Sequence, residues 1–152
     1  MTNFRSARRL AIALTVVSAV LLSTQQGWAE HCSNRTTEGT YTVVGEGFLS
    51  TGPNTPLVPA KLLSLVTADA NGTYTGTGTI TVGGQVFVQR VVGTQLLQSD
   101  CSGSITYRQT LGGQPAPDLH FTFIVSEHGD RIDGLAVDPG TVFSAVLRRL
   151  ER

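Results

Sequence analysis

Charged residues are scarce in this sequence, and lysine is almost absent. Aspartate, glutamate, lysine and arginine make up 14% of the 152 residues, and Lys61 is the single lysine. Roughly a quarter is usual for a soluble domain. Eleven basic residues balance eleven acidic ones, which excludes a strongly basic nucleic-acid-binding protein and an acidic solvating tail. Hydrophobic residues reach 40%, enough for a packed core in a chain of one-domain length.

The composition typical of helices is also missing. The chain contains 17 glycines, and glycine weakens a helix by about 1 kcal/mol per residue relative to alanine. A helix-rich domain would carry more lysine, glutamate and alanine and far less glycine. The composition therefore favours an all-β protein outside the cytoplasm.

No apolar run is long enough to span a membrane, but a shorter one lies near the N-terminus. It covers the 13 residues Leu10–Leu22 and follows the basic residues Arg5, Arg8 and Arg9, whereas a spanning helix needs about 20. A polar stretch with small residues then ends at Ala29. This three-part layout is typical of a secretory signal peptide. We expect residues 1–29 to be removed and residues 30–152 to form a single secreted or periplasmic domain without a stable membrane anchor.

Only two cysteines are present, Cys32 and Cys101, and both follow the expected cleavage site. In an oxidising compartment an even pair most simply forms a disulfide. A redox or nucleophilic thiol is the alternative, but neither cysteine has a CxxC spacing or a nearby basic partner. We expect a disulfide that ties the N-terminus of the secreted chain to a turn deep in the sequence.

Motifs for metal binding and nucleophilic chemistry are missing as well. His31, His120 and His128 lie on separate segments without the spacing of metal ligands. The sequence also has no calcium loop, no G-x-S-x-G elbow and no phosphate-binding loop. We expect neither a metal nor an organic cofactor.

Apolar and polar residues alternate with period two from Tyr41 to the end, and turn residues interrupt the pattern regularly. Eight antiparallel strands with short links can close into an up-and-down barrel of the size that holds one small ligand. A two-sheet sandwich is the alternative. The predicted strands cover residues 39–49, 60–67, 73–82, 86–97, 103–110, 119–126, 131–137 and 141–149.

The third predicted strand indicates which of its faces is interior. Every second residue from Thr73 to Thr81 is threonine, and we expect this face in solvent. The other face carries Tyr74 and Ile80, with Gly76 and Gly78 between them. Glycines at interior positions suggest sharp bending or room for something bulky. Apolar residues on both faces of the fourth and eighth strands suggest a partner surface, so a homodimer is plausible.

Six residues are candidates for holding a ligand inside the barrel. Arg90 lies in an apolar row and would anchor a carboxylate or enolate oxygen, unless the face of Phe87 and Val91 is interior and Arg90 lies in water. A tyrosine inside the barrel could donate a hydrogen bond to a ligand oxygen, but could equally be an ordinary strand aromatic. Glu46 is a candidate base, with an exposed strand-end position as the alternative. The full candidate set is Arg90, Tyr41, Tyr74, Tyr107, His120 and Glu46.

Three segments carry a resemblance to a known group of proteins. Asp100–Ser104, His120–Val125 and Asp138–Val142 resemble turn-and-strand motifs of small secreted bacterial proteins of unassigned function. The resemblance covers most of residues 39–152 and implies a calycin-type barrel, shared in outline by lipocalins and allene oxide cyclase-like proteins. Some of those barrels are cyclases that fold a polyene or polyketide in an apolar interior. No catalytic residue of those families maps onto this chain.

These observations lead to three functional hypotheses. The first is a secreted barrel that binds a small, mostly apolar or amphipathic molecule. The second is a cyclase or isomerase of a natural-product intermediate, which would shape its substrate without metal or cofactor. The third is a structural or interaction protein with a filled interior. Whether any reaction is catalysed stays open, and nucleic acid is not an expected partner.

Overall fold

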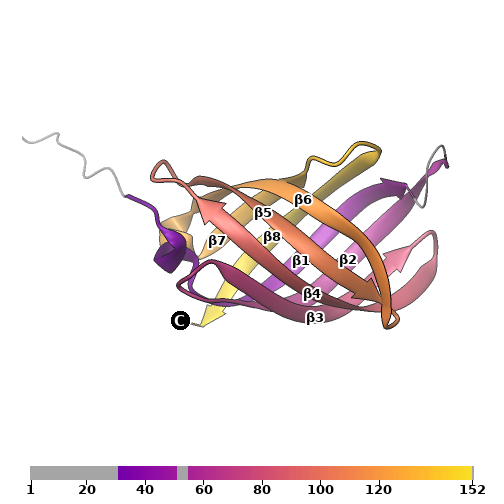
Figure 1. Ribbon diagram of the computed structural model, residues 1–152, viewed down its shortest axis with the longest axis horizontal. Helices are drawn as coiled ribbons and strands as arrows, with labels where there is room; N and C mark the ends of the chain where they lie inside the picture. Colours follow the sequence, from indigo (N-terminus) through magenta and orange to yellow (C-terminus); the bar gives the residue numbers. More distant parts are fainter. Residues whose placement is uncertain (1–30, 51–54, 152) are drawn as a thin grey trace, which may run out of the picture. The chain divides into compact units, whose positions relative to one another are not determined.

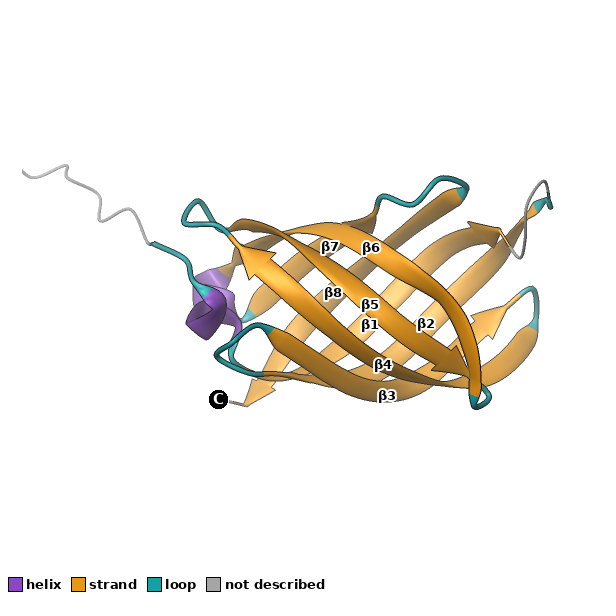
Figure 2. Ribbon diagram, viewed as in Figure 1, coloured by secondary structure: helices purple, strands orange, loops and turns teal. Residues whose placement is uncertain are grey.

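Eight antiparallel strands, each paired with the next along the chain, close into a barrel in the computed structural model, which describes residues 31–50 and 55–151 (Figure 1). The pairing of the first strand with the last confirms the predicted up-and-down barrel and excludes the sandwich. Two short 3-10 helices, η1 (Asn34–Thr37) and η2 (Glu127–Gly129), complete the fold (Figure 2). The expected signal peptide lies outside the described residues. The strands are β1 (Gly39–Ser50), β2 (Leu57–Ala68), β3 (Thr73–Val82), β4 (Gln85–Leu97), β5 (Ser102–Leu111), β6 (Gln114–Ser126), β7 (Arg131–Ala136) and β8 (Thr141–Glu151).

Strands β2 and β6 begin earlier than predicted, because prolines had marked these segments as loops. Pro59, Pro115 and Pro117 all lie within strands and are exposed. Gly112 and Gly113, with φ of 58° and 86°, form a two-residue turn directly after β5. This tight turn brings the chain back into pairing at once, so β6 starts five residues before the predicted position.

The inward and outward faces of β3 are as predicted. Tyr74 and Ile80 are each 2% exposed inside the barrel, while Thr75, Thr77 and Thr79 are exposed on its outer face. The glycines between Tyr74 and Ile80 do not leave empty space, however. A Cβ at either position would collide with β2, where Val66 and Ser64 lie against the bare backbone. The two glycines therefore allow β2 and β3 to lie close together.

Other interior glycines each lie under an aromatic ring from a neighbouring strand. A Cβ on Gly93 would lie 2.8 Å from Cδ1 of Tyr107, and one on Gly45 would lie 2.6 Å from Cε1 of Phe143. Such glycine–aromatic pairs fix the ring against the sheet, because the ring covers backbone that has no side chain of its own. They orient the aromatic side chains that form the interior.

The predicted disulfide between Cys32 and Cys101 is present. It ties the segment before η1 to the β4–β5 turn, and the backbone N–H of Cys32 donates to the carbonyl of Ser99. The bond holds η1 at the end of the barrel where the C-terminus lies (Figure 1).

Candidate functional site

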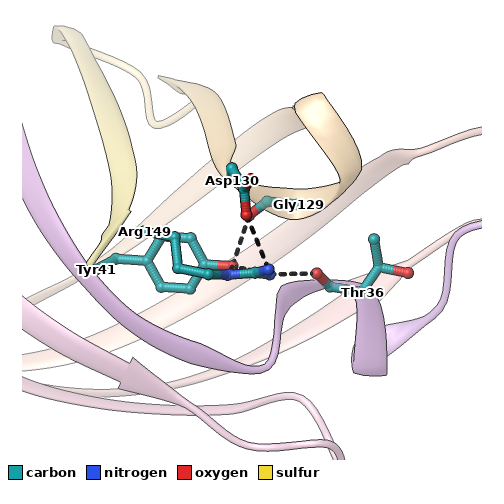
Figure 3. Close-up of polar contacts among 5 residues, drawn as sticks. All are labelled: Thr36, Tyr41, Gly129, Asp130 and Arg149. Atoms are coloured by element: carbon teal, nitrogen blue, oxygen red, sulfur yellow. Dashed lines mark hydrogen bonds and ion pairs between the residues drawn. The ribbon is translucent and has the colours of Figure 1, made fainter. Parts of the chain in front are cut away.

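An arginine and a tyrosine close this end of the barrel (Figure 3). The guanidinium of Arg149 donates from Nη2 to the hydroxyl of Tyr41 at 2.7 Å and to the carbonyl of Thr36 at 2.5 Å, and forms an ion pair with Asp130 at 3.0 Å. The Tyr41 hydroxyl donates to the carbonyl of Gly129 at 2.8 Å. We call these five residues the floor. Because its hydroxyl is already bonded within the floor, Tyr41 is not available to a ligand.

A second polar layer packs beside the floor. Thr37 is completely buried and donates to the carbonyl of Asn34, while Nε2 of Gln95 donates to Oγ1 of Thr37 at 2.5 Å. Burial raises the pKa of the Tyr74 phenol above its ordinary value, and the neighbouring Thr37 hydroxyl partly opposes this shift. Tyr74 thus reaches from the interior into the closed end.

Beyond these layers lies the lumen, the cavity enclosed by the strands. Its volume is about 60 Å³. One water needs roughly 10–15 Å³ of cavity volume, so the lumen has room for a small or slender molecule. Most of its walls are aliphatic or aromatic, and no lining residue is charged. The polar lining residues are Ser64, Tyr74, Gln89, Tyr107 and Gln109.

A chain of aromatic rings crosses the interior. Tyr107 contacts Tyr74 and Phe121 edge to face, with ring centroids 6.3 and 5.8 Å apart, and Phe121 contacts Phe143 in the same way. Burial raises the pKa of the Tyr107 phenol, so the hydroxyl stays neutral. Within the described part of the chain this hydroxyl has no hydrogen-bond partner.

Polar groups line the wall formed by β2 to β5. Nε2 of Gln89 donates to Oε1 of Gln109 at 2.7 Å, and Nε2 of Gln109 donates to the carbonyl of Pro117. Ser64 and Gln89 lie in one cross-strand row, separated only by Gly78. This wall therefore offers amide and hydroxyl groups but no ionised group.

Three predicted site residues lie on the outside of the barrel. Arg90 is exposed on the outer face of β4, because Gln89 and Val91 point inward. The alternative that placed Arg90 in water is the correct one. Apolar residues occur on both faces of β4, so alternation alone did not decide between them.

Glu46 and His120 are also on the outside. Glu46 forms an exposed ion pair with Lys61 at 3.9 Å. Nδ1 of His120 lies 2.7 Å from a carboxylate oxygen of Asp138, whose other oxygen accepts the backbone N–H of His120. His120 thus fastens the β7–β8 loop to β6. Of the six predicted residues, the structure brings only Tyr74 and Tyr107 to the lumen.

Sequence reasoning missed Arg149, although a signal was present. Phe143, Ala145 and Leu147 alternate along β8 on the interior face, and Arg149 continues this row. A charge in an apolar row was the argument applied to Arg90, and it applies better here. Ser64 and Gln89 had no such signal, because an uncharged polar residue in a strand is common on either face.

The fold and the lumen define a class: a small, eight-stranded antiparallel barrel with one closed end, consistent with a calycin-like barrel. No model of a known protein family matches the chain, and no curated protein is significantly similar to it. In residues 31–50 and 55–151, no group of three histidine, cysteine or acidic side chains could hold a metal ion. The same residues contain no helix long and apolar enough to cross a membrane.

Proposed function

We propose that this protein is a secreted barrel that binds a small, mostly apolar molecule in its lumen. The observation that carries the proposal is an uncharged, largely aliphatic and aromatic cavity above a hydrogen-bonded floor. Enclosed apolar cavities with a few uncharged polar groups are typical small-molecule sites. The Cys32–Cys101 disulfide fits an oxidising compartment, and the N-terminal pattern of a signal peptide supports secretion.

A variant that fills the lumen tests this proposal. A Cβ on Gly134, which lines the cavity, would meet its nearest atom at 3.7 Å, an ordinary contact. Gly134→Val should therefore fold and occupy ligand space. The control is Thr79→Val on the outer face of β3, where the side chain is exposed.

Hexane is a suitable first probe, and its binding is followed by amide chemical shifts. We expect interior amides of the wild type and of Thr79→Val to shift on titration, and those of Gly134→Val to shift little. Equal binding by all three proteins, or by none of them, would contradict binding in the lumen. Failure of all three to bind would favour a filled interior.

A cyclase or isomerase of a polyketide- or polyene-like intermediate is the second candidate. The observation that favours it is the Tyr107 hydroxyl, which has no partner in the described chain and lies among apolar walls. Such a hydroxyl could polarise a carbonyl while the cavity holds a flexible substrate in shape. Incubation of the protein with a compound extracted from it separates the two candidates, since a carrier returns the compound unchanged and a cyclase returns an isomer.

A further inference from the structure

The lumen contains polar atoms that no protein group satisfies. Three such atoms are the hydroxyl of Tyr107, the hydroxyl of Ser64 and the side-chain oxygen Oε1 of Gln89. None of them has a hydrogen-bond partner among the described residues. The side-chain oxygen Oε1 of Gln95 also lacks a hydrogen-bond partner, but it is buried and Gln95 does not line the lumen. The other three side chains line the lumen, so a bound molecule can reach them. None of these three atoms is fully buried, so water can reach them, and a ligand group that bonds to one of them takes the place of that water.

Tyr107 is the most rigidly placed of the three. Its ring lies over Gly93 and is held by edge-to-face contacts with Tyr74 and Phe121. Ordering this side chain on binding therefore costs little entropy, because the ring is already fixed. Its hydroxyl is a preorganised contact for one oxygen atom of a ligand.

The charge of the ligand follows from the rest of the wall. No arginine, lysine, histidine or acidic residue lines the lumen, and Arg149 is engaged by Tyr41, Thr36 and Asp130 in the floor. An ionised group buried here would lose its hydration without gaining a partner of opposite charge, which is strongly unfavourable.

We infer that the ligand is uncharged and carries a carbonyl or hydroxyl oxygen that makes a hydrogen bond with the hydroxyl of Tyr107. Simple ketones, enones and alcohols on a slender apolar body belong to this class, and ionised fatty acids do not. This inference rests on the proposed function, since it concerns the same lumen.

Three six-carbon probes test the inference: hexane, hexan-2-one and hexanoate, each titrated into the purified protein and followed by amide chemical shifts. We expect Tyr107→Phe to weaken hexan-2-one about three- to tenfold, the range of one net hydrogen bond, and to leave hexane unchanged. Thr79→Val is the control, because this side chain lies on the outer face of β3 and does not line the lumen. It should leave the affinity for both probes unchanged.

Hexanoate tests the charge requirement. We expect no binding at neutral pH, and binding to appear only when the pH is low enough to protonate the carboxylate. Equal hexan-2-one affinity in wild type and Tyr107→Phe, or tight hexanoate binding at neutral pH, would overturn the inference. In either case hexane binding that Gly134→Val abolishes would leave the proposed function standing. If neither hexane nor hexan-2-one binds, the proposed function itself fails.

Discussion

Arg149 shows how a charged residue can stabilise the interior of a protein with few charges. Its side chain is only 6% exposed, yet each of its three nitrogens has a partner: Nε and Nη2 the Tyr41 hydroxyl, Nη2 the Thr36 carbonyl, and Nη1 the Asp130 carboxylate. The guanidinium also lies 5.3 Å from the centroid of the Tyr41 ring. A buried cation is tolerated when its donors are satisfied in this way.

Replacing this arginine tests the role of the floor. We expect Arg149→Met to lower the free energy of unfolding by about 2–4 kcal/mol, because it leaves the Thr36 carbonyl and the Tyr41 ring without their cation. Arg148→Met, on the exposed face of the same strand, should change stability by no more than about 0.5 kcal/mol. Urea unfolding measures both, and equal losses would contradict the account.

A second residue-scale prediction concerns Gly93. A Cβ there would lie 2.8 Å from both the Tyr107 ring and the Thr106 carbonyl oxygen. We expect Gly93→Ala to destabilise the barrel by about 1–3 kcal/mol through overpacking and to weaken hexan-2-one by displacing the Tyr107 hydroxyl.

The control is Gly134→Ala, another interior glycine whose added Cβ meets nothing closer than 3.7 Å. It should change stability little. Thermal unfolding of the two variants would contradict this account if Gly134→Ala were the more damaging.

At the scale of elements, the disulfide and η1 act together. The 69-residue separation between Cys32 and Cys101 is long enough for the cross-link to reduce the entropy of the unfolded chain substantially. It also anchors the segment that leads to η1, which supplies the Thr36 carbonyl to the floor.

Removal of the disulfide should therefore destabilise the floor. We expect the double substitution of Cys32 and Cys101 by serine to cost about 2–4 kcal/mol of stability and to increase amide exchange in η1 more than in β6. Unfolding curves and hydrogen exchange measure the two effects. Unchanged protection of η1 would show that the floor does not depend on the cross-link.

The elements also show how far the sequence could predict the fold. Asn71-Gly72, Gly83-Gly84 and regular alternation indicated the hairpins, and β3 was predicted with the correct ends. The start of β6 was missed because its prolines lie at exposed strand positions. The polar residues of the lumen were harder to predict. Ser64 and Gln89 are polar, and only the pairing of their strands shows that they face the interior.

At the scale of the whole molecule, the outer face carries many apolar side chains. Val44, Leu63 and Val142 are exposed by 58, 63 and 58% on β1, β2 and β8. These strands are adjacent, and the Glu46–Lys61 ion pair lies among their apolar residues. A patch with one charge of each sign can pair with its own copy about a two-fold axis.

We expect this face to support a homodimer, measured by sedimentation at several concentrations. Leu63→Lys should shift the protein toward monomer, because it places a charge within the apolar patch. Ile124→Lys on β6, outside these three strands, is the control and should leave the dimer intact. A wild type that sediments as a monomer throughout the concentration range would contradict the expectation.

The central claim is that the lumen holds a small apolar molecule, and native mass spectrometry of the protein purified from its own host tests it most directly. We expect a single added mass that organic extraction removes, and extraction should release an uncharged compound bearing oxygen. The same preparation of Gly134→Val should lack the added mass. A wild type whose mass equals that of the chain alone, and whose amide signals do not respond to hexane or hexan-2-one, would contradict the account and indicate a filled barrel.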